Sequence, residues 1–275
     1  MTRSLLVLLA AFVAVFAGAG GVMAQELETV GAPTDWQWDF QGPNSPIMED
    51  IHDFYDVYLL PMMVIISVIV LALMAYIMIR FRRSRNPEPT RTTHNTILEV
   101  IWTSVPVLIL VIIAIPSLRL LYDTERLDEA DVTIKATGNQ WFWSYEYPDY
   151  GLEFDAYILE DEEPRLLVTD TQVVVPVNQV IRVQLTSADV IHAWALPAAG
   201  VKMDAVPGRL NELQMTITDP GIYYGQCSEL CGYSHGFMPI MVVVMEEADF
   251  EAWVSEQQAA LGIVPETDLA AATQD

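Results

Sequence analysis

Two long apolar stretches in the first half of the chain predict a pair of membrane-spanning helices. The first runs from Val57 to Ile79 without a formal charge, which at roughly 1.5 Å per residue gives about 35 Å of helix, enough to cross a bilayer. The second runs from Ile97 to Tyr122 and is interrupted by four charged or kink-forming residues, Glu99, Pro106, Pro116 and Arg119. We therefore predict a transmembrane hairpin over residues 57–122, with spans at 57–79 and 97–122 and a connecting loop at 80–96.

The connecting loop is strongly basic and fixes the expected orientation of the hairpin. It contains the five arginines Arg80, Arg82, Arg83, Arg85 and Arg91. Short cytoplasmic loops of membrane proteins are enriched in Lys and Arg, so this loop is predicted to lie in the cytoplasm and both ends of the hairpin outside.

The first 24 residues have the pattern of an export signal. Arg3 supplies the positive start, Leu5 to Ala17 the apolar run, and Val22-Met23-Ala24 a small-residue cleavage site. Cleavage would leave an extracytoplasmic segment over residues 25–56. An uncleaved membrane anchor is the alternative, although the apolar run is short for a span. Export of this end agrees with the orientation predicted from the basic loop.

From Asp123 onward the pattern changes to short β-rich runs. Four of them lie at residues 132–136, 180–187, 212–217 and 238–245, and turn signals such as Val206-Pro207-Gly208 and Asp219-Pro220-Gly221 separate them. This pattern predicts an all-β domain over residues 123–252, either a Greek-key sandwich or a small barrel. Residues 249–261 have the pattern of a terminal helix, and residues 253–275 are assigned to a C-terminal tail.

Composition and charge narrow the functional classes. Hydrophobic residues make up 52% of the 275 residues and charged residues only 18%, which excludes a disordered chain and fits a membrane component. The formal net charge is −24, from 37 acidic and 13 basic residues. Nucleic acid requires a basic surface and is therefore not an expected partner, whereas a basic protein is.

A cluster of metal-binding residue types is the most informative feature. Cys227 and Cys231, the two cysteines of the chain, are followed by His235 and Met238 in a C-x3-C-x3-H-x2-M pattern, and His192 lies at the end of an earlier strand-like run. Thiolate, imidazole and thioether donors suit copper better than a hard cation. A mononuclear copper site needs only one cysteine. The second thiolate therefore indicates two coppers, because adjacent thiolates repel one another unless cations lie between them.

Each of these residues also has a simpler interpretation. The two cysteines could form a disulfide in an oxidising compartment, and His192 and Met238 could be ordinary core residues. A disulfide needs neither His235 nor Met238 at these offsets. The complete pattern therefore favours copper.

The residues around this cluster resemble a known family. The stretch Tyr224 to Gly232 (YGQCSELCG), with His235 and Met238-Pro239, is similar to subunit 2 of the cytochrome c oxidases of the haem-copper superfamily. The motifs at 138–147 (GNQWFWSYEY) and 204–209 (DAVPGR) share the resemblance, which runs from about Asp53 to Trp253. The exported N-terminus and the long acidic C-terminal tail are similar to those of the bacterial aa-type members.

The resemblance implies a cupredoxin-like Greek-key barrel that carries a dinuclear copper centre, CuA, on the two-helix anchor. The implied copper ligands are His192, Cys227, Cys231, His235, Met238 and the backbone carbonyl of Glu229, with both cysteines bridging the metals. The side chain of Glu229 would separately bind magnesium at the contact with subunit 1, because a carboxylate suits that hard ion. Outside this motif, a solvated loop carboxylate would be the better interpretation of such a glutamate.

An aromatic run after Gln140 bears on how electrons reach the copper. Strand alternation would place Trp141, Trp143, Tyr145 and Tyr147 on one face, and core packing is the simpler interpretation for most of them. The family resemblance implies that Trp141 is the exposed point at which an electron from cytochrome c enters. The candidate docking acids for this basic partner are Glu146, Asp149, Glu153, Asp155 and Asp189, any of which could instead be a solubilising surface charge.

Glu99 is the single acid within a predicted span. Thr96-Ile97-Leu98-Glu99 fits a capping box, so the residue could simply stabilise the start of its helix. The resemblance implies in addition that Glu99 lies at the mouth of a proton-uptake path into subunit 1. The two roles are compatible.

The implied function is that of a subunit of a respiratory oxidase in a bacterial inner membrane, with its copper domain in the periplasm. Electrons would pass from cytochrome c through CuA to haem a of subunit 1, where oxygen is reduced and protons are pumped, and subunit 3 is a further expected partner. A quinol oxidase subunit would lack the cysteines, a copper carrier would need exchangeable ligands, and the copper domain of nitrous oxide reductase is soluble. A fused haem domain is not expected, because the sequence has no C-x2-C-H motif.

Overall fold

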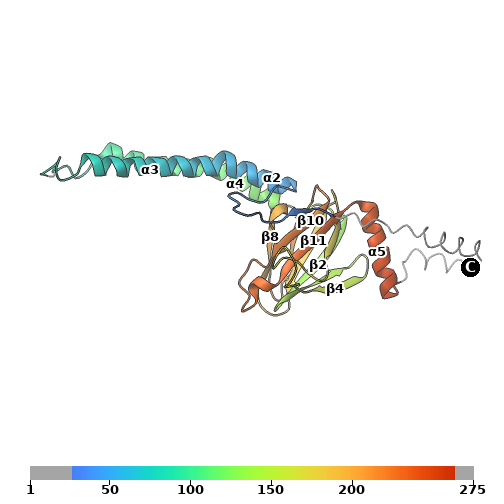
Figure 1. Ribbon diagram of the computed structural model, residues 1–275. Coiled ribbons are helices and arrows are strands. Elements are labelled where there is room, and N and C mark those ends of the chain that lie inside the picture. Colours follow the sequence, from blue (N-terminus) through green and yellow to red (C-terminus); the bar gives the residue numbers. More distant parts are fainter. Residues whose placement is uncertain (1–26, 89, 264–275) are drawn as a thin grey trace, which may run out of the picture.

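The computed structural model describes residues 27–88 and 90–263 and consists of two apolar helical arms that project from a β domain (Figure 1). The predicted signal peptide at 1–24 and the end of the predicted tail, 264–275, lie outside the described residues. Both arms are long and apolar enough to cross a membrane, and neither buries its apolar surface within the chain. Two apolar helices followed by a β domain agree with the architecture predicted from the sequence.

The first arm begins earlier than the hydrophobic pattern predicted. Helix α2 (Pro46–Phe54), the π-helical turn η1 (Tyr55–Leu59) and helix α3 (Leu60–Arg80) follow one another without a break. Ser45 caps the start, since its hydroxyl accepts a 3.0 Å hydrogen bond from the Met48 N–H and Pro46 occupies the first turn. The membrane span from Val57 stays a prediction for the apolar part of this helix, because capping residues set where a helix begins whereas hydropathy marks only its apolar part.

The second arm is helix α4 (Thr96–Thr124), which contains Pro106 and Pro116. Its N-cap is Asn95, whose side chain accepts a 3.1 Å hydrogen bond from the Leu98 N–H. The N-cap is thus one residue earlier than the predicted capping box of Thr96 and Glu99 requires, and Leu98 rather than Glu99 stands at the third helical position, so that box does not form. Glu99 lies in the first turn, where an acidic side chain favours the positive end of the helix dipole.

Two sheets form the β domain. One contains β1 (Thr29–Gly31), β10 (Gly221–Gln226), β11 (Pro239–Met245) and β5 (Val173–Pro176) in that order. The other has the order β4 (Leu152–Ala156), β3 (Phe142–Tyr147), β2 (Val132–Asn139), β6 (Ile181–Ser187) and β9 (Asn211–Met215). Strands β7 (His192–Leu196) and β8 (Val201–Ala205) make a separate antiparallel pair. Among the described residues the sheets do not close, so of the two predicted alternatives, a sandwich and a small barrel, the structure has the sandwich.

Alternating burial along the strands explains why the sheets pack face to face. In β2 every second residue is buried, and in β3 Trp143, Tyr145 and Tyr147 point into a core shared by both sheets. Trp141 precedes β3 and packs half-buried against the same core, whereas Trp143, Tyr145 and Tyr147 are buried in it. That Trp141 shares the face of these three aromatic residues stays a prediction. The chain turns at Gln140-Trp141 before the alternation begins.

The segment before the first arm attaches that arm to the β domain. Strand β1 pairs parallel to β10, with Thr29 opposite Ile222. Farther along, the Asn44 N–H donates to the Ala198 carbonyl and the Asn44 carbonyl accepts from the Thr218 N–H, both at 3.0 Å. The Ser45 hydroxyl donates to the Ala199 carbonyl at 2.7 Å. The predicted extracytoplasmic segment therefore contributes a strand to the domain, a feature that the sequence pattern did not predict.

The chain continues after β11 as helix α5 (Glu247–Leu261), which ends at Gly262 in a left-handed conformation. Phe250 and Val254 are buried against the sandwich, and the Trp253 ring lies 5.6 Å from that of Tyr147. A terminal helix was predicted, but the assignment of a tail from residue 253 was wrong, since the helix packs on the core through that position.

Candidate metal centre

The candidate donors come from the beginning of one strand and from one long loop. His192 is the first residue of β7, and β7 lies against β10. Strands β10 and β11 pair antiparallel, and the pair Gln226 and Pro239 closes the ladder. Residues 227–238 therefore leave the sheet and return to it as a single loop. This loop brings Cys227, Cys231, His235 and Met238 to the end of the sandwich where His192 lies.

The donor atoms converge on a space of a few ångströms. Cys227 Sγ lies 3.8 Å from His192 Nδ1 and 3.4 Å from the Glu229 carbonyl oxygen. Cys231 Sγ lies 3.5 Å from His235 Nδ1 and 3.6 Å from Met238 Sδ. The two sulfurs are 3.8 Å apart, and each has one histidine nitrogen and one weak donor within 4 Å. All six donors expected from the family resemblance are thus brought together.

The cysteines are free thiols rather than a disulfide. Their 3.8 Å separation greatly exceeds the S–S bond length of about 2.05 Å. His192, Cys227, Cys231 and Met238 are all buried, whereas His235 is half-buried. A disulfide was one of the simpler interpretations of these cysteines, and the structure does not contain it.

The donor set fits copper. His192, Cys227 and Cys231 each offer an atom within 4.8 Å of the others, which is the spacing of groups that hold a metal. Two thiolates, two imidazoles and a thioether are soft or borderline donors, the set that selects copper among common metals. In addition, a buried pair of thiolates requires neighbouring cations to offset the repulsion between them.

Asp189 holds the far side of the His192 ring. Its Oδ1 atom lies 2.9 Å from His192 Nε2, and Oδ2 accepts a 2.7 Å hydrogen bond from the Gln140 N–H. Nε2 is thereby kept protonated and Nδ1 faces the sulfurs, the arrangement by which carboxylates orient metal-binding histidines. Burial alone would lower the pKa of His192, but Cys227 and Asp189 outweigh this effect and raise it.

The two thiols have opposite acid–base properties. Burial would raise the pKa of Cys227, but hydrogen bonding from His192 and from nearby backbone outweighs it and lowers the value to about 6. Burial and the neighbouring negative charge of Cys227 raise the pKa of Cys231 to about 12. Cys227 is therefore available as a thiolate near neutral pH, whereas Cys231 needs a bound metal to favour the loss of its proton.

Trp141 and Gln140 contact the centre through the backbone of Cys231. The Trp141 Nε1–H donates to the Cys231 carbonyl at 3.3 Å, and the Gln140 side-chain amide donates to the same oxygen at 2.8 Å. The indole is half-buried, so one edge contacts the loop while another part is open to solvent. Trp141 thus connects the surface directly with a residue of the donor set.

The five candidate docking acids do not form one cluster. Glu146 is paired with Lys135 at 2.6 Å, and Asp189 is engaged with His192. Asp155 accepts a hydrogen bond from Ser144, near the start of β3, and Glu153 is exposed opposite Glu146. Asp149 is exposed in the turn at the far end of β3, roughly 20 Å from Trp141 at about 3.3 Å per residue. Asp155 and Asp189 are therefore the acids best placed beside the indole.

Sequence reasoning identified the donors but missed how they are supported. Gln140 was not singled out, and Asp189 was considered only as a docking charge. Gln140 and Cys231 are 91 positions apart, so no spacing pattern links them, whereas Asp189 lies three residues before His192 and its contact is local. The side chain of Glu229 is exposed on the loop, and Glu99 is half-buried at the start of α4 on the opposite side of the predicted membrane segment.

Comparison with known proteins agrees with this geometry. Family models of the periplasmic domain and the transmembrane domain of cytochrome c oxidase subunit II match residues 132–245 and 33–120. A probable cytochrome c oxidase subunit 2 of Rickettsia bellii is 45% identical over 87% of this chain and 91% of its own length. Cytochrome c oxidase subunit 2 of Cereibacter sphaeroides is 42% identical over 87% of this chain and 89% of its own length.

A solved structure is similar to part of this chain. The crystal structure of the periplasmic domain of subunit II of cytochrome oxidase from Bradyrhizobium japonicum is 57% identical, covers 49% of this chain and 99% of its own, and gives a TM-score of 0.48. The resemblance read from the sequence is confirmed by the two family models and by the relatives. The chain belongs to the cytochrome c oxidase subunit 2 family, whose members are parts of a membrane-bound oxidoreductase.

Proposed function

We propose that this chain accepts electrons from cytochrome c at a dinuclear copper centre and passes them to haem a of subunit 1, where oxygen is reduced to water and protons are pumped. One observation carries the proposal. Two free thiols 3.8 Å apart each have a separate imidazole and a separate weak donor, which is a donor set for two metals rather than one.

The residues that would hold the copper are those brought together by the loop and by β7. Cys227 and Cys231 would bridge two ions, His192 and His235 would each bind one, and Met238 and the Glu229 carbonyl would complete the set. Bound there, a copper pair would take up and release one electron at a time. The exposed Glu229 side chain would bind magnesium at the contact with subunit 1, since a carboxylate is a suitable ligand for that ion.

Trp141 is proposed as the point at which the electron arrives. Its indole reaches solvent on one side and donates a hydrogen bond to the Cys231 carbonyl on the other. A short bonded path therefore connects the surface with one bridging thiolate. Asp155, Asp189 and Glu153 would attract the basic face of cytochrome c toward this indole, and Glu146 and Asp149 would add to the longer-range field.

The membrane part gives the proposed orientation and the proton path. Five arginines between the two arms favour the cytoplasmic side, which puts the β domain in the periplasm. Glu99 then lies near the cytoplasmic side, where it would receive protons bound for subunit 1. Both arms are long enough to cross a membrane and expose their apolar side chains, which agrees with packing against subunit 1. In the complete oxidase the chain would also associate with subunit 3.

The test uses the full chain assembled in its oxidase complex. Copper analysis should give about two coppers in addition to those of subunit 1, and electron paramagnetic resonance should show the hyperfine pattern of one electron shared by two nuclei. Trp141→Phe removes the hydrogen bond to Cys231 but keeps a ring, so electron transfer from reduced cytochrome c should slow while the copper spectrum persists. A single copper, or unchanged transfer in this variant, would contradict the proposal. Phe142→Leu, on the neighbouring surface position, is the matched control.

A further inference from the structure

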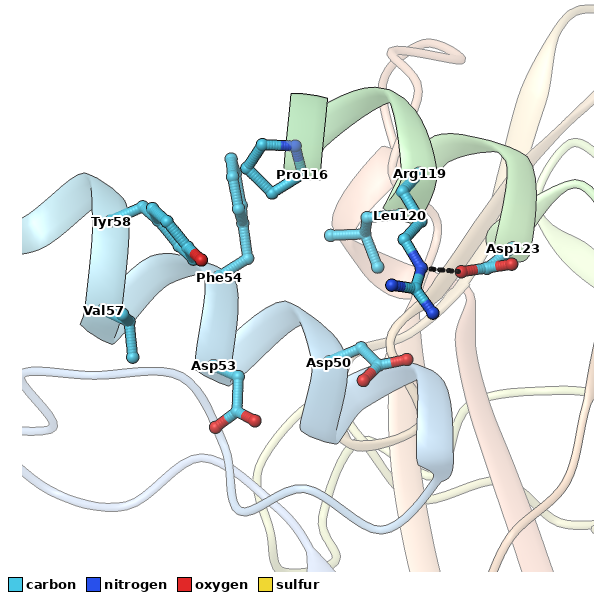
Figure 2. A pocket seen from close by; sticks show the side chains of 9 residues that line it. All are labelled: Asp50, Asp53, Phe54, Val57, Tyr58, Pro116, Arg119, Leu120 and Asp123. Atoms are coloured by element: carbon cyan, nitrogen blue, oxygen red, sulfur yellow. Dashed lines mark ion pairs between the residues drawn. The ribbon is translucent and has the colours of Figure 1, made fainter. Parts of the chain in front are cut away.

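A charged cavity lies where the two helical arms leave the β domain (Figure 2). It has a volume of about 450 Å³ and is formed by α2, η1 and the last turns of α4. Its charged lining consists of one cation, Arg119, and three carboxylates, Asp50, Asp53 and Asp123. The formal charge of the lining is therefore +1 − 3 = −2. Such a lining can contact a positive and a negative group at once, with a preference for the positive one.

The charged groups in this cavity are largely unsatisfied by the chain itself. Arg119 Nε lies 4.0 Å from Asp123 Oδ2, and 87% of the Arg119 side chain is exposed. An exposed pair at this distance is weak, so the guanidinium N–H groups remain available to an anion. Asp50 and Asp53 have no ion-pair partner among the residues that the structure describes. Figure 2 shows the Arg119 side chain directed from α4 toward the α2 side, where Asp50 lies.

An apolar groove continues from the cavity along the two arms. It has a volume of about 540 Å³ and is lined by α3 from Pro61 to Val70 and by Val105 and Ile109 of α4. Val57 and Tyr58 line both spaces, so the charged cavity and the apolar groove adjoin. From Val57 to Val70 the helix rises about 20 Å at roughly 1.5 Å per residue. A charged end and an apolar length of this order match an amphiphile that lies along the helices.

The depth of the cavity in the membrane agrees with this shape. Asp50 and Asp53 precede the apolar stretch of the first arm, and Arg119 and Asp123 lie at the end of the second. The charged groups are thus at the level of lipid headgroups, and the groove lies at the level of the hydrocarbon.

We propose that the cavity and groove together bind one aminophospholipid, a glycerophospholipid whose headgroup carries a primary ammonium group. Arg119 would donate hydrogen bonds to the phosphate, Asp50 and Asp53 would accept them from the ammonium group, and one acyl chain would lie along Val57 to Val70. Phosphatidylglycerol offers no cation to the two carboxylates, and the quaternary ammonium of phosphatidylcholine has no N–H to donate. The site therefore selects by headgroup. This inference depends on the membrane hairpin and not on the copper chemistry.

The test measures lipid binding by native mass spectrometry, first on the full chain in detergent and then on the purified oxidase complex. Phosphatidylethanolamine, phosphatidylglycerol and phosphatidylcholine with identical acyl chains are each titrated into delipidated protein. Wild-type protein should bind phosphatidylethanolamine about tenfold more tightly than the other two, the difference expected from one charge-assisted hydrogen bond. This comparison needs no variant and so does not depend on the folding of one.

Two variants then locate the site. Arg119→Gln and Asp53→Asn should each weaken phosphatidylethanolamine binding about tenfold, whereas Arg83→Gln, an equal change at the opposite membrane face, should not. Equal affinity for phosphatidylethanolamine and phosphatidylglycerol, or unchanged binding in both site variants, would overturn the proposal. So would a complex that binds no lipid here although the isolated chain does, because a partner helix would then occupy the groove. The copper spectrum should persist in both variants, because neither residue lies at the metal centre. Failure of the lipid proposal would therefore leave the copper proposal intact.

Discussion

The side-chain amide of Gln140 donates a 2.8 Å hydrogen bond to the backbone carbonyl of Cys231. The backbone N–H of the same residue donates to Asp189, which holds the His192 ring. Gln140 therefore connects the loop that carries the cysteines with the segment that carries His192, and it does so beside the Trp141 indole. The candidate metal centre is supported by a residue that offers it no donor atom.

Replacement of Gln140 by alanine should loosen the Cys231 loop. The variant loses one hydrogen bond to a half-buried carbonyl, so the free energy of unfolding should fall by about 1 kcal/mol. In copper-loaded protein the hyperfine pattern should change, because the Cys231 backbone is free to shift. Gln179→Ala is the control, since the Gln179 side chain bonds only to the distant Glu247. A copper spectrum identical to wild type in the Gln140 variant would rule out this supporting role.

Replacement of Asp189 by asparagine should lower the pKa of His192. In the native chain burial opposes the protonated ring, whereas Cys227 and Asp189 favour it and prevail. The neutral amide removes one of these two favourable charges, so the ring should lose its proton at lower pH. Histidine resonances of metal-free chain, followed by NMR through a pH titration, measure this. Asp155→Asn, which contacts Ser144 and not His192, should leave the titration unchanged. An unaltered His192 titration in Asp189→Asn would contradict the assigned contact.

The two thiols of metal-free chain should ionise in separate steps. Thiolate absorbance should rise once near pH 6, from Cys227, and again near pH 12, from Cys231. Cys227→Ser should abolish the first step and move the second toward the ordinary value of 9.0, because the repelling charge is gone. Two thiols that titrate together near that ordinary value would show that the hydrogen bonding from His192 has no effect on Cys227.

The same pKa values predict how stability depends on pH. The pKa of Cys227 is lower in the folded chain than its ordinary 9.0. Its contribution to the free energy of unfolding is therefore absent below pH 6, grows between pH 6 and 9, and is complete above pH 9. Cys231 has a raised pKa and therefore removes stability between pH 9 and 12. Unfolding midpoints of metal-free chain should accordingly pass through a maximum near pH 9. A midpoint that falls steadily from pH 6 to 9, relative to Cys227→Ser, would be inconsistent with these values.

A methyl group at position 138 should displace the His192 ring and so disturb the metal centre. A Cβ atom built on Gly138 would lie 2.8 Å from Cδ2 of the buried His192 ring, so the imidazole must move. Gly138→Ala should therefore weaken copper binding by about tenfold or more, the effect typical of altered support around a metal ligand. Competition with a copper chelator measures this change. Gly236→Ala is the matched control, because nothing lies within 4 Å of its added Cβ. Equal copper affinity in the two variants would contradict the expectation.

The elements with strong periodic patterns were the ones that the sequence predicted well. The apolar arms, the alternating strand at 132–136 and the donors Cys227, Cys231, His235 and Met238 follow from local spacing. Their limits were less accurate where capping decides them, as at Ser45 and Asn95. The choice between a sandwich and a barrel stayed open for a related reason. Whether strands close a sheet depends on pairing between distant segments, which alternation along one strand does not encode.

The supporting contact between Gln140 and Cys231 could not be predicted from the sequence, because it joins residues far apart in the chain. Gln140 reaches Cys231 across 91 positions. Strand β1 was missed as well, since three residues, Thr29–Gly31, are too few to establish a period. The first contact follows from the packing of the two sheets, and the second from the pairing of β1 with β10 within one sheet. Both arrangements have to be known before the partners can be named.

The attachment of the N-terminal segment to the sandwich has a mechanical consequence. The β domain is joined to the hairpin covalently through the end of α4 and is bound again through β1, Asn44 and Ser45, so it resists swivelling about a single linker. The height of the cysteine loop above the bilayer is then a property of this chain alone. Because electron tunnelling slows steeply with separation, the proposed transfer to a subunit packed against the helices would occur over a constant distance, without that subunit having to hold the β domain in place.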